Sequence, residues 1–237
     1  MARKKIVFVI VEGPSDDDAL SLLLSRIYDK DTVHVHIMHG DITSDKDVTP
    51  TNIVTKLCDT VKDYAESSHF VSEHFQEIIH LVDTDGAYIP DVSVVEDKKA
   101  VSLIYSETEI RTANKSATEQ RNKRKKANIN KLCTCKNIWG IPYRVYYMSC
   151  NLDHVLYNKL NSSDEDKEQD AHRFAKQYKD DIPGFLRFIS ESDFSVMGGY
   201  KESWQFVKEE LHSLERHTNF GLCFLGKIEA ESGENTT

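Results

Sequence analysis

Carboxylate side chains follow two apolar segments of this sequence, at the points where the segments end. Glu12 comes directly after the run KIVFVIV (5–11), and Asp83 and Asp85 follow the run EIIHLV (77–82). Both runs have the nearly continuous apolar character of strands that are buried on both faces of a parallel sheet. Ligands of such sheets bind beyond the carboxyl ends of the strands. The sequence therefore predicts that these acids meet at one sheet edge.

A site of this composition favours a divalent cation. Period-two alternation places Asp83 and Asp85 on one side of the chain, and Asp16, one turn into the following helix, can point back to the same edge. Converging carboxylates repel one another and raise one another's pKa values. A cation removes that cost, and all-oxygen ligation suits Mg²⁺ or Mn²⁺.

Each acid also has a structural interpretation. Asp16 lies in the first turn of a helix that we expect to be capped by Ser15, where the helix dipole favours acids. The DTDG sequence (83–86) is composed of ordinary turn residues. Helix capping does not explain Glu12, because it directly follows an apolar run. The combination of acids at predicted strand ends therefore favours the metal site.

Alternating strands and helices over the first third of the chain predict an α/β fold with a parallel sheet and right-handed crossovers. The pattern indicates the following elements: strands at 5–11, 33–38, 77–82, 101–105 and 141–149, helices at 15–27, 53–64, 114–132, 151–160 and 204–214, and a surface helix or a linker at 161–181. We expect a catalytic domain over 1–160, with an insertion at 87–140 that carries a basic helix. Residues 161–237 are expected to form a helical C-terminal lobe with a frayed tail.

Composition narrows the class of protein. The 237 residues are 39% apolar and 29% charged, as in soluble globular chains. No apolar run approaches the ~18 residues that span a bilayer, and the N-terminal run is too short for a signal peptide. The five cysteines form no CxxC pair, so we expect reduced thiols, a cytoplasmic protein and no membrane partner.

The charge is unevenly distributed. Nine basic residues and the single acid Glu119 give the segment 111–136 a charge of +8, whereas the whole chain carries −9 and the remainder therefore −17. Lysine and arginine bind phosphates without regard to base sequence. The sequence predicts a nucleic-acid contact on the stretch Arg121, Lys123, Arg124, Lys125 and Lys126; a solvated helix face is the structural alternative.

Three short blocks resemble the Toprim fold of topoisomerases, primases and certain nucleases. IVFVIVEGPSDDDAL (6–20) and IIHLVDTDG (78–86) resemble its Glu and DxD motifs, with the added Asp16 typical of OLD-type nucleases, and YYMSCNLDHVLYN (146–158) resembles the Ser-Asn-x-x-Glu segment of RloB-like proteins. Asp153 stands where that segment has a longer glutamate, which implies a contact through water. The stretch 86–141 is longer than a minimal Toprim core.

The resemblance implies a Rossmann-like sheet and a nuclease that uses one or two Mg²⁺ or Mn²⁺ ions. Asp83 and Asp85 would hold one ion, Asp16 and Asp153 would help hold a second, and Glu12 would be a ligand or the general base. Ser149 and Asn151 would orient a phosphate or a water, and Lys159 is our choice for the lysine that stabilises the transition state.

Other functions remain open on the sequence. Several Toprim proteins of this kind act in prokaryotic defence against phage beside a separate ATPase. No Walker A pattern occurs in this sequence. Any ATP hydrolysis would therefore come from a separate ATPase partner. One alternative is a non-catalytic Toprim-like module that binds a partner or senses a nucleotide, and a homo-oligomer is possible for either. The other is a phosphatase of the haloacid dehalogenase type, whose DxDG motif LVDTDG resembles, although here it follows the third strand.

Overall fold

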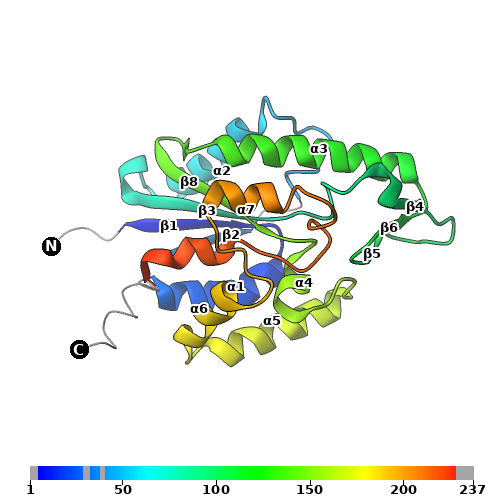
Figure 1. The fold of residues 1–237 in the computed structure, drawn as a ribbon. Coiled ribbons are helices and arrows are strands. Elements are labelled where there is room, and N and C mark those ends of the chain that lie inside the picture. The colour runs from blue at the N-terminus through cyan, green and yellow to red at the C-terminus, as the bar shows by residue number, and fades with distance from the viewer. Residues whose placement is uncertain (1–4, 29–32, 38–40, 228–237) are drawn as a thin grey trace.

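A computed structural model of the chain describes residues 5–28, 33–37 and 41–227 (Figure 1). The expected frayed tail lies almost entirely outside these residues. The central feature is a five-stranded sheet with the order β2-β1-β3-β8-β7. Its strands are β1 (Ile6–Val11), β2 (Val33–Ile37), β3 (Phe75–Asp83), β7 (Asn137–Ile138) and β8 (Ile141–Met148).

Four of these strands are parallel. β1 pairs with β2 and β3, and β3 pairs with β8, all in the parallel sense. The edge strand β7 is antiparallel to β8 and reaches it through Trp139 and Gly140, both with positive φ, as a two-residue hairpin turn requires. The predicted α/β class with a parallel sheet flanked by helices is thus confirmed at that level, with an antiparallel edge that the sequence analysis missed.

Seven helices are present among the described residues. They are α1 (Pro14–Ile27), α2 (Ile53–Ser67), α3 (Lys115–Thr134), α4 (Leu152–Tyr157), α5 (Asp164–Tyr178), α6 (Ile182–Glu191) and α7 (Tyr200–Phe206). Short 3₁₀ turns η1 (Ser72–His74), η2 (Asp91–Ser93) and η3 (Phe220–Phe224) complete the set. α4 ends at Tyr157 because Asn158 adopts a left-handed conformation, and α7 is shorter than the predicted helix 204–214.

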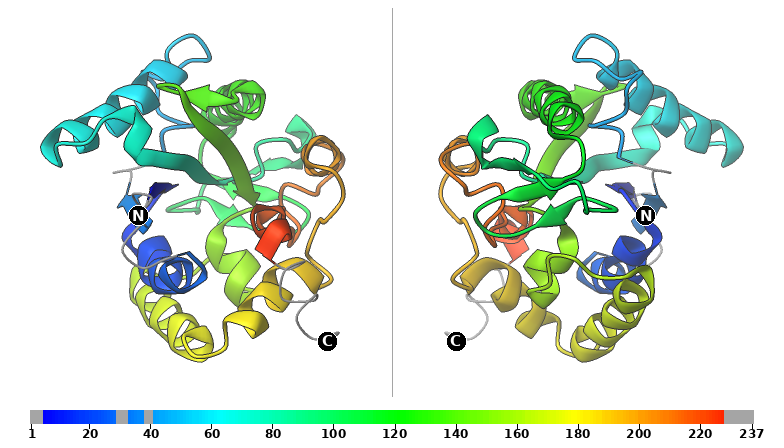
Figure 2. Two further views of the ribbon diagram at one scale, coloured as in Figure 1. Left: turned by 90° about the vertical axis from the view of Figure 1, so that its left-hand side faces the viewer. Right: turned by 90° about the vertical axis from the view of Figure 1, so that its right-hand side faces the viewer.

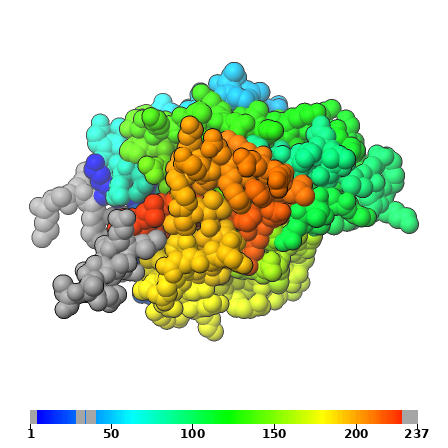
Figure 3. Space-filling model, in the orientation of Figure 1, coloured from blue at the N-terminus to red at the C-terminus, as the bar shows by residue number. Residues whose placement is uncertain are grey.

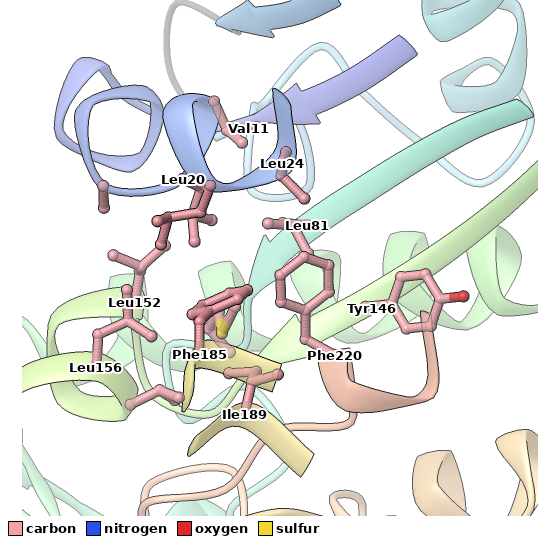
Figure 4. Packing of buried hydrophobic residues seen from close by; sticks show 14 of the residues in the cluster. Val11, Leu20, Leu24, Leu81, Tyr146, Leu152, Leu156, Phe185, Ile189 and Phe220 are labelled. Atoms are coloured by element: carbon pink, nitrogen blue, oxygen red, sulfur yellow. The ribbon is translucent and has the colours of Figure 1, made fainter. Parts of the chain in front are cut away.

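Two layers of helices cover the sheet, and each has its own apolar core. On one face, residues of β1, β3 and β8 pack with α1, α4, α5 and α6; Leu20, Leu81, Leu152, Phe185 and Phe220 are representative members (Figure 4). On the other face the same strands pack against α2 and α3. In Figure 3 the segment around α7 (orange) lies between α3 (green) and the helices α5 and α6 (yellow), and covers the sheet from that side.

A second, three-stranded sheet lies within the segment 87–140. Its strands β4 (Val94–Glu96), β5 (Ile104–Tyr105) and β6 (Ile110–Thr112) have the order β4-β6-β5, in place of the single predicted strand 101–105. We call residues 87–113 the strand insertion. It lies across the carboxyl ends of the main strands (Figure 2, right), and Val94 and Ile110 bury its inner side against Leu214.

Candidate active site

The acids that follow β1 and β3 meet at one end of the main sheet, as the sequence predicted. The backbone N–H of Asp83 donates a hydrogen bond of 3.2 Å to Glu12 Oε1, which joins the ends of the two neighbouring strands. Asp83 Oδ1 accepts a hydrogen bond of 3.0 Å from the N–H of Leu152, at the start of α4. The sheet therefore positions Glu12, and the helix terminus orients Asp83.

Asp85 lies in a sharp turn beyond β3. Asp85 and Gly86 both have positive φ, while Thr84, between Asp83 and Asp85, is buried and donates its hydroxyl to the Ser213 carbonyl. A Cβ on Gly86 would stand 2.6 Å from Leu214 Cδ2, so the turn fits tightly and only glycine is accommodated there. The turn aims the Asp83 and Asp85 carboxylates into the same cluster.

The ammonium group of Lys125 lies among these carboxylates. Its Nζ is 2.5 Å from Asp85 Oδ2, 2.6 Å from Asp41 Oδ2 and 3.9 Å from Glu12 Oε1, and the side chain is fully buried. Lys125 projects from the middle of α3. We call Glu12, Asp41, Asp83, Asp85 and Lys125 the carboxylate cluster.

Burial and like charge shift the pKa values of the cluster. Burial first, and then the neighbouring carboxylates, raise the pKa of Glu12 and of Asp83 well above the ordinary values, against the opposing effect of Lys125. The pKa of Asp41 is lowered because Lys125 and hydrogen bonds outweigh its burial. The carboxylates likewise hold the pKa of Lys125 well above its ordinary value despite burial. The lysine is therefore a cation and shares its charge among more acids than it can neutralise.

Arg121 supplies a second cation at the rim of the cluster. Its guanidinium donates to the Asp85 carbonyl at 2.8 Å and to the Tyr105 hydroxyl at 2.7 Å. That hydroxyl in turn donates to Asp85 Oδ1 at 3.3 Å. α3 and the strand insertion thus both contact Asp85.

Asp16 and Asp153 form a neighbouring pair. Asp16 Oδ2 accepts hydrogen bonds from the N–H groups of Gly13 and Glu12, so it caps α1, which begins after Gly13 and not after the predicted cap Ser15. Burial, and next to it the charge of Asp153, raise the pKa of Asp16 to about 6. Lys167 Nζ lies 3.9 Å from Asp153. The structure therefore brings these two acids together, as the resemblance implied.

Two of the predicted orienting and catalytic side chains are engaged elsewhere. The Ser149 hydroxyl is buried and donates to the His212 carbonyl, and Lys159 is paired with Asp170 on α5 at 2.5 Å. The lysine that lies among the carboxylates is Lys125 and not Lys159. Asn151 caps α4 through His154 N–H and also lines a cavity with Asp83 and Asp85.

The predicted nucleic-acid stretch divides between two sides of α3. Lys125 and Arg121, four residues apart and therefore on the same side of the helix, contact Asp85, so these two of the five predicted phosphate contacts face the cluster. Arg124 donates to the Ser44 carbonyl at 2.7 Å. Lys123 and Lys126 are exposed; Lys123 lies 3.4 Å from Asp91, and Lys126 lies over the Tyr88 ring.

Sequence reasoning missed Asp41 and the role of Lys125. Asp41 comes four residues after the last residue of β2, so its signal was a third acid near a strand end. Its Oδ1 accepts from Thr43, and Asn128 of α3 donates to the carbonyls of Thr43 and Val48, which ties the segment that carries Asp41 to the helix that carries Lys125.

The donor set of the cluster fits a hard cation. Four carboxylates from three strand ends supply only oxygen ligands, and one ammonium does not balance them. Within the described residues, however, no three His, Cys, Asp or Glu side chains stand in an arrangement ready to hold a metal ion. The Lys125 ammonium is the cation about which these carboxylates are arranged.

Two further expectations concern the whole chain. All five cysteines are free thiols, as predicted. No helix in the described part of the chain is both long and apolar enough to cross a bilayer. We compared the chain with protein-family models, with curated proteins and with solved structures, and none of the three comparisons returned a match.

Proposed function

We propose that this protein is a Toprim-type nuclease that hydrolyses phosphodiester bonds with the help of Mg²⁺ or Mn²⁺ at the carboxylate cluster. The observation that carries the proposal is the convergence of Glu12, Asp41 and Asp85 on one buried lysine, with Asp83 joined to Glu12 by a hydrogen bond, at the carboxyl edge of a parallel sheet. Two of the three sequence blocks that resemble Toprim nucleases supply Glu12, Asp83 and Asp85, whereas Asp41 and Lys125 lie outside the blocks.

Charge balance supports a metal ion. Four carboxylates face the charges of Lys125 and Arg121, so the fully ionised cluster has an excess of two negative charges. Burial and the neighbouring negative charges raise the pKa values of Glu12 and Asp83, so the excess favours uptake of a proton or of a cation. A divalent cation would supply the same neutralisation, together with activation of a water and stabilisation of the leaving oxygen.

Each side chain at the site has a proposed role. Asp83 and Asp85 are the proposed ligands of a first ion, with Asp16 and Asp153 beside them for a second. Glu12 is the proposed ligand or general base: burial raises its pKa, and a carboxylate with a higher pKa is a stronger base. Lys125 is the cation we propose next to the transferring phosphate, and the exposed Lys123 and Lys126 would contact the nucleic-acid backbone.

Incubation of the purified protein with DNA and RNA tests the proposal. We expect cleavage of labelled DNA or RNA with Mg²⁺ or Mn²⁺ and none with EDTA. The matched control is Asp63→Asn, which removes an exposed acid on α2 and should cleave as the wild type does. Absence of cleavage under every metal condition would contradict the proposal.

One observation favours a second function. Because Lys125 already lies among the carboxylates, the cluster has a resident cation, as expected of a non-catalytic Toprim-like module that binds a partner. On that interpretation the protein binds nucleic acid or a partner protein without cleaving, and metal does not stabilise the fold.

Metal-dependent stabilisation separates the two functions without an activity assay. Mg²⁺ or Mn²⁺ at ten times its dissociation constant should raise the free energy of unfolding by about 1.4 kcal/mol, because the ion binds only the folded chain. The Asp83→Asn plus Asp85→Asn protein should show no such gain. The measurement is thermal or urea unfolding with and without the ion, and an equal gain in both proteins would place the ion elsewhere.

A further inference from the structure

The carboxylate cluster opens to solvent through a small polar cavity. The cavity has a volume of about 300 Å³, at the low end for ligand sites. Asp83 and Asp85 form its floor, Lys167 supplies a cation, and the remaining lining comes from Ser102, Leu103, Tyr105, Asn151, Leu160, Asn161 and Ser162. The Ser162 hydroxyl oxygen is buried there without a hydrogen-bond partner.

The strand insertion forms one wall of this cavity and is tied to the opposite wall. Tyr105 N–H donates to Asn161 Oδ1 at 2.9 Å, and Asn161 Nδ2 donates to the Tyr105 carbonyl at 2.8 Å. The Asn161 amide thus pairs with the backbone of β5 as a neighbouring strand would. We call this pair of hydrogen bonds the Asn161 clamp; it joins the insertion to the segment between α4 and α5.

With the insertion clamped in place, the acids of the cluster are only slightly exposed to solvent. The side chains of Glu12 and Asp85 are 16% and 19% exposed, and Lys125 is not exposed at all. A duplex presents its phosphates on a broad convex surface and keeps its bases stacked inside. Enzymes that act in a narrow pocket on such a substrate must first extrude a nucleotide, which costs the free energy of unpairing and unstacking it. In an unpaired strand no base pair has to be broken.

We propose that the clamped insertion restricts the site to single-stranded nucleic acid, with one nucleotide in the cavity between Asp85 and Lys167. This inference rests on the nuclease function proposed above and adds the class of its substrate. Lys167 and the Ser162 hydroxyl face the phosphate and the polar groups of that nucleotide. Asn161 is a positioning residue that sets the width of the opening and does not take part in the reaction.

The test compares one sequence in two forms. Single-stranded DNA and RNA oligonucleotides are incubated with Mg²⁺ or Mn²⁺ beside a DNA duplex and an RNA duplex of the same sequence, each closed by hairpin loops resistant to cleavage, so that frayed ends supply no single strand. The wild-type protein should cleave the closed duplexes at least about tenfold more slowly than the corresponding single strands.

The variants test whether the clamp causes the selectivity. Asn161→Ala and Asn161→Leu both remove the two hydrogen bonds, and leucine retains the side-chain volume. Each should raise the rate on the closed duplexes and bring the ratio of the two rates toward one. Asn137→Ala, at an exposed asparagine of β7 on the opposite edge of the sheet, should leave the ratio as in the wild type.

Three results would overturn parts of the inference. Equal wild-type rates on the two forms contradict the substrate class and leave the nuclease function intact. A selective wild type whose ratio is unchanged in both Asn161 variants contradicts the role of the clamp. No cleavage of any substrate contradicts the nuclease function itself.

Discussion

Replacing Glu12 by glutamine should lower single-turnover cleavage by about three orders of magnitude, because several kcal/mol of charge stabilisation at a metal site is removed. Glutamine retains the oxygen that accepts the hydrogen bond from Asp83 N–H, so the ends of β1 and β3 stay joined. Binding of single-stranded oligonucleotide should therefore persist. Single-turnover kinetics at saturating protein, beside a binding titration, measure the two effects separately.

The exposed acid Asp63 again provides the control, as Asp63→Asn. A Glu12→Gln protein that cleaves at the wild-type rate would exclude Glu12 as ligand and as base. If cleavage and binding are lost together, the residue holds the fold of the strand ends and its chemical role is unsupported.

Replacing Lys125 by methionine should lower the free energy of unfolding by about 3–5 kcal/mol at neutral pH, since it leaves buried carboxylates without their counter-ion. Methionine is one atom shorter than lysine, keeps most of the apolar stem and lacks the ammonium group. Lys131→Met is the matched control, because Lys131 is exposed on the same helix and its loss should cost little.

The destabilisation should be smaller at pH 5 than at pH 7.5. Without the ammonium, the pKa values of Glu12 and Asp83 rise beyond their already raised values, because Lys125 is the group that lowers them. The folded variant then binds protons that the unfolded chain, with ordinary carboxyl pKa values, does not bind, so its stability increases as the pH falls. Urea unfolding at the two pH values measures this; an equal loss at both would assign the effect to packing and not to charge.

The sequence was informative where burial is continuous. The runs 5–11, 77–82 and 141–149 predicted β1, β3 and β8 within a residue or two, because a strand covered on both faces must be apolar throughout. Their ends then located Glu12, Asp83 and Asp85 at one edge, since parallel strands share a direction. The antiparallel β7 has only two residues, too few to show a period.

The role of α3 could not be predicted from periodicity. Its buried face is largely polar and includes Thr118, Asn122, Lys125 and Asn128, so its pattern is that of an exposed basic helix. Lys125 and Asn128 find their hydrogen-bond partners in the carboxylates and carbonyls of the segment after β2 and of the turn after β3, and these partners are distant in the sequence. Asp41 could not be predicted for the same reason. Its contact with Lys125 identifies it as a member of the cluster, and Lys125 is remote from it in the sequence.

The separation of Lys125 from its acids along the chain has a consequence for synthesis and refolding. Glu12, Asp41 and Asp83 all precede Lys125 in the chain and therefore emerge from the ribosome before it. Contacts between such remote positions pay a large loop-closure cost and form slowly. Until Lys125 arrives, water must remain at the strand ends to solvate the acids. The carboxyl edge is thus expected to close last, after the strands and the apolar layers have assembled.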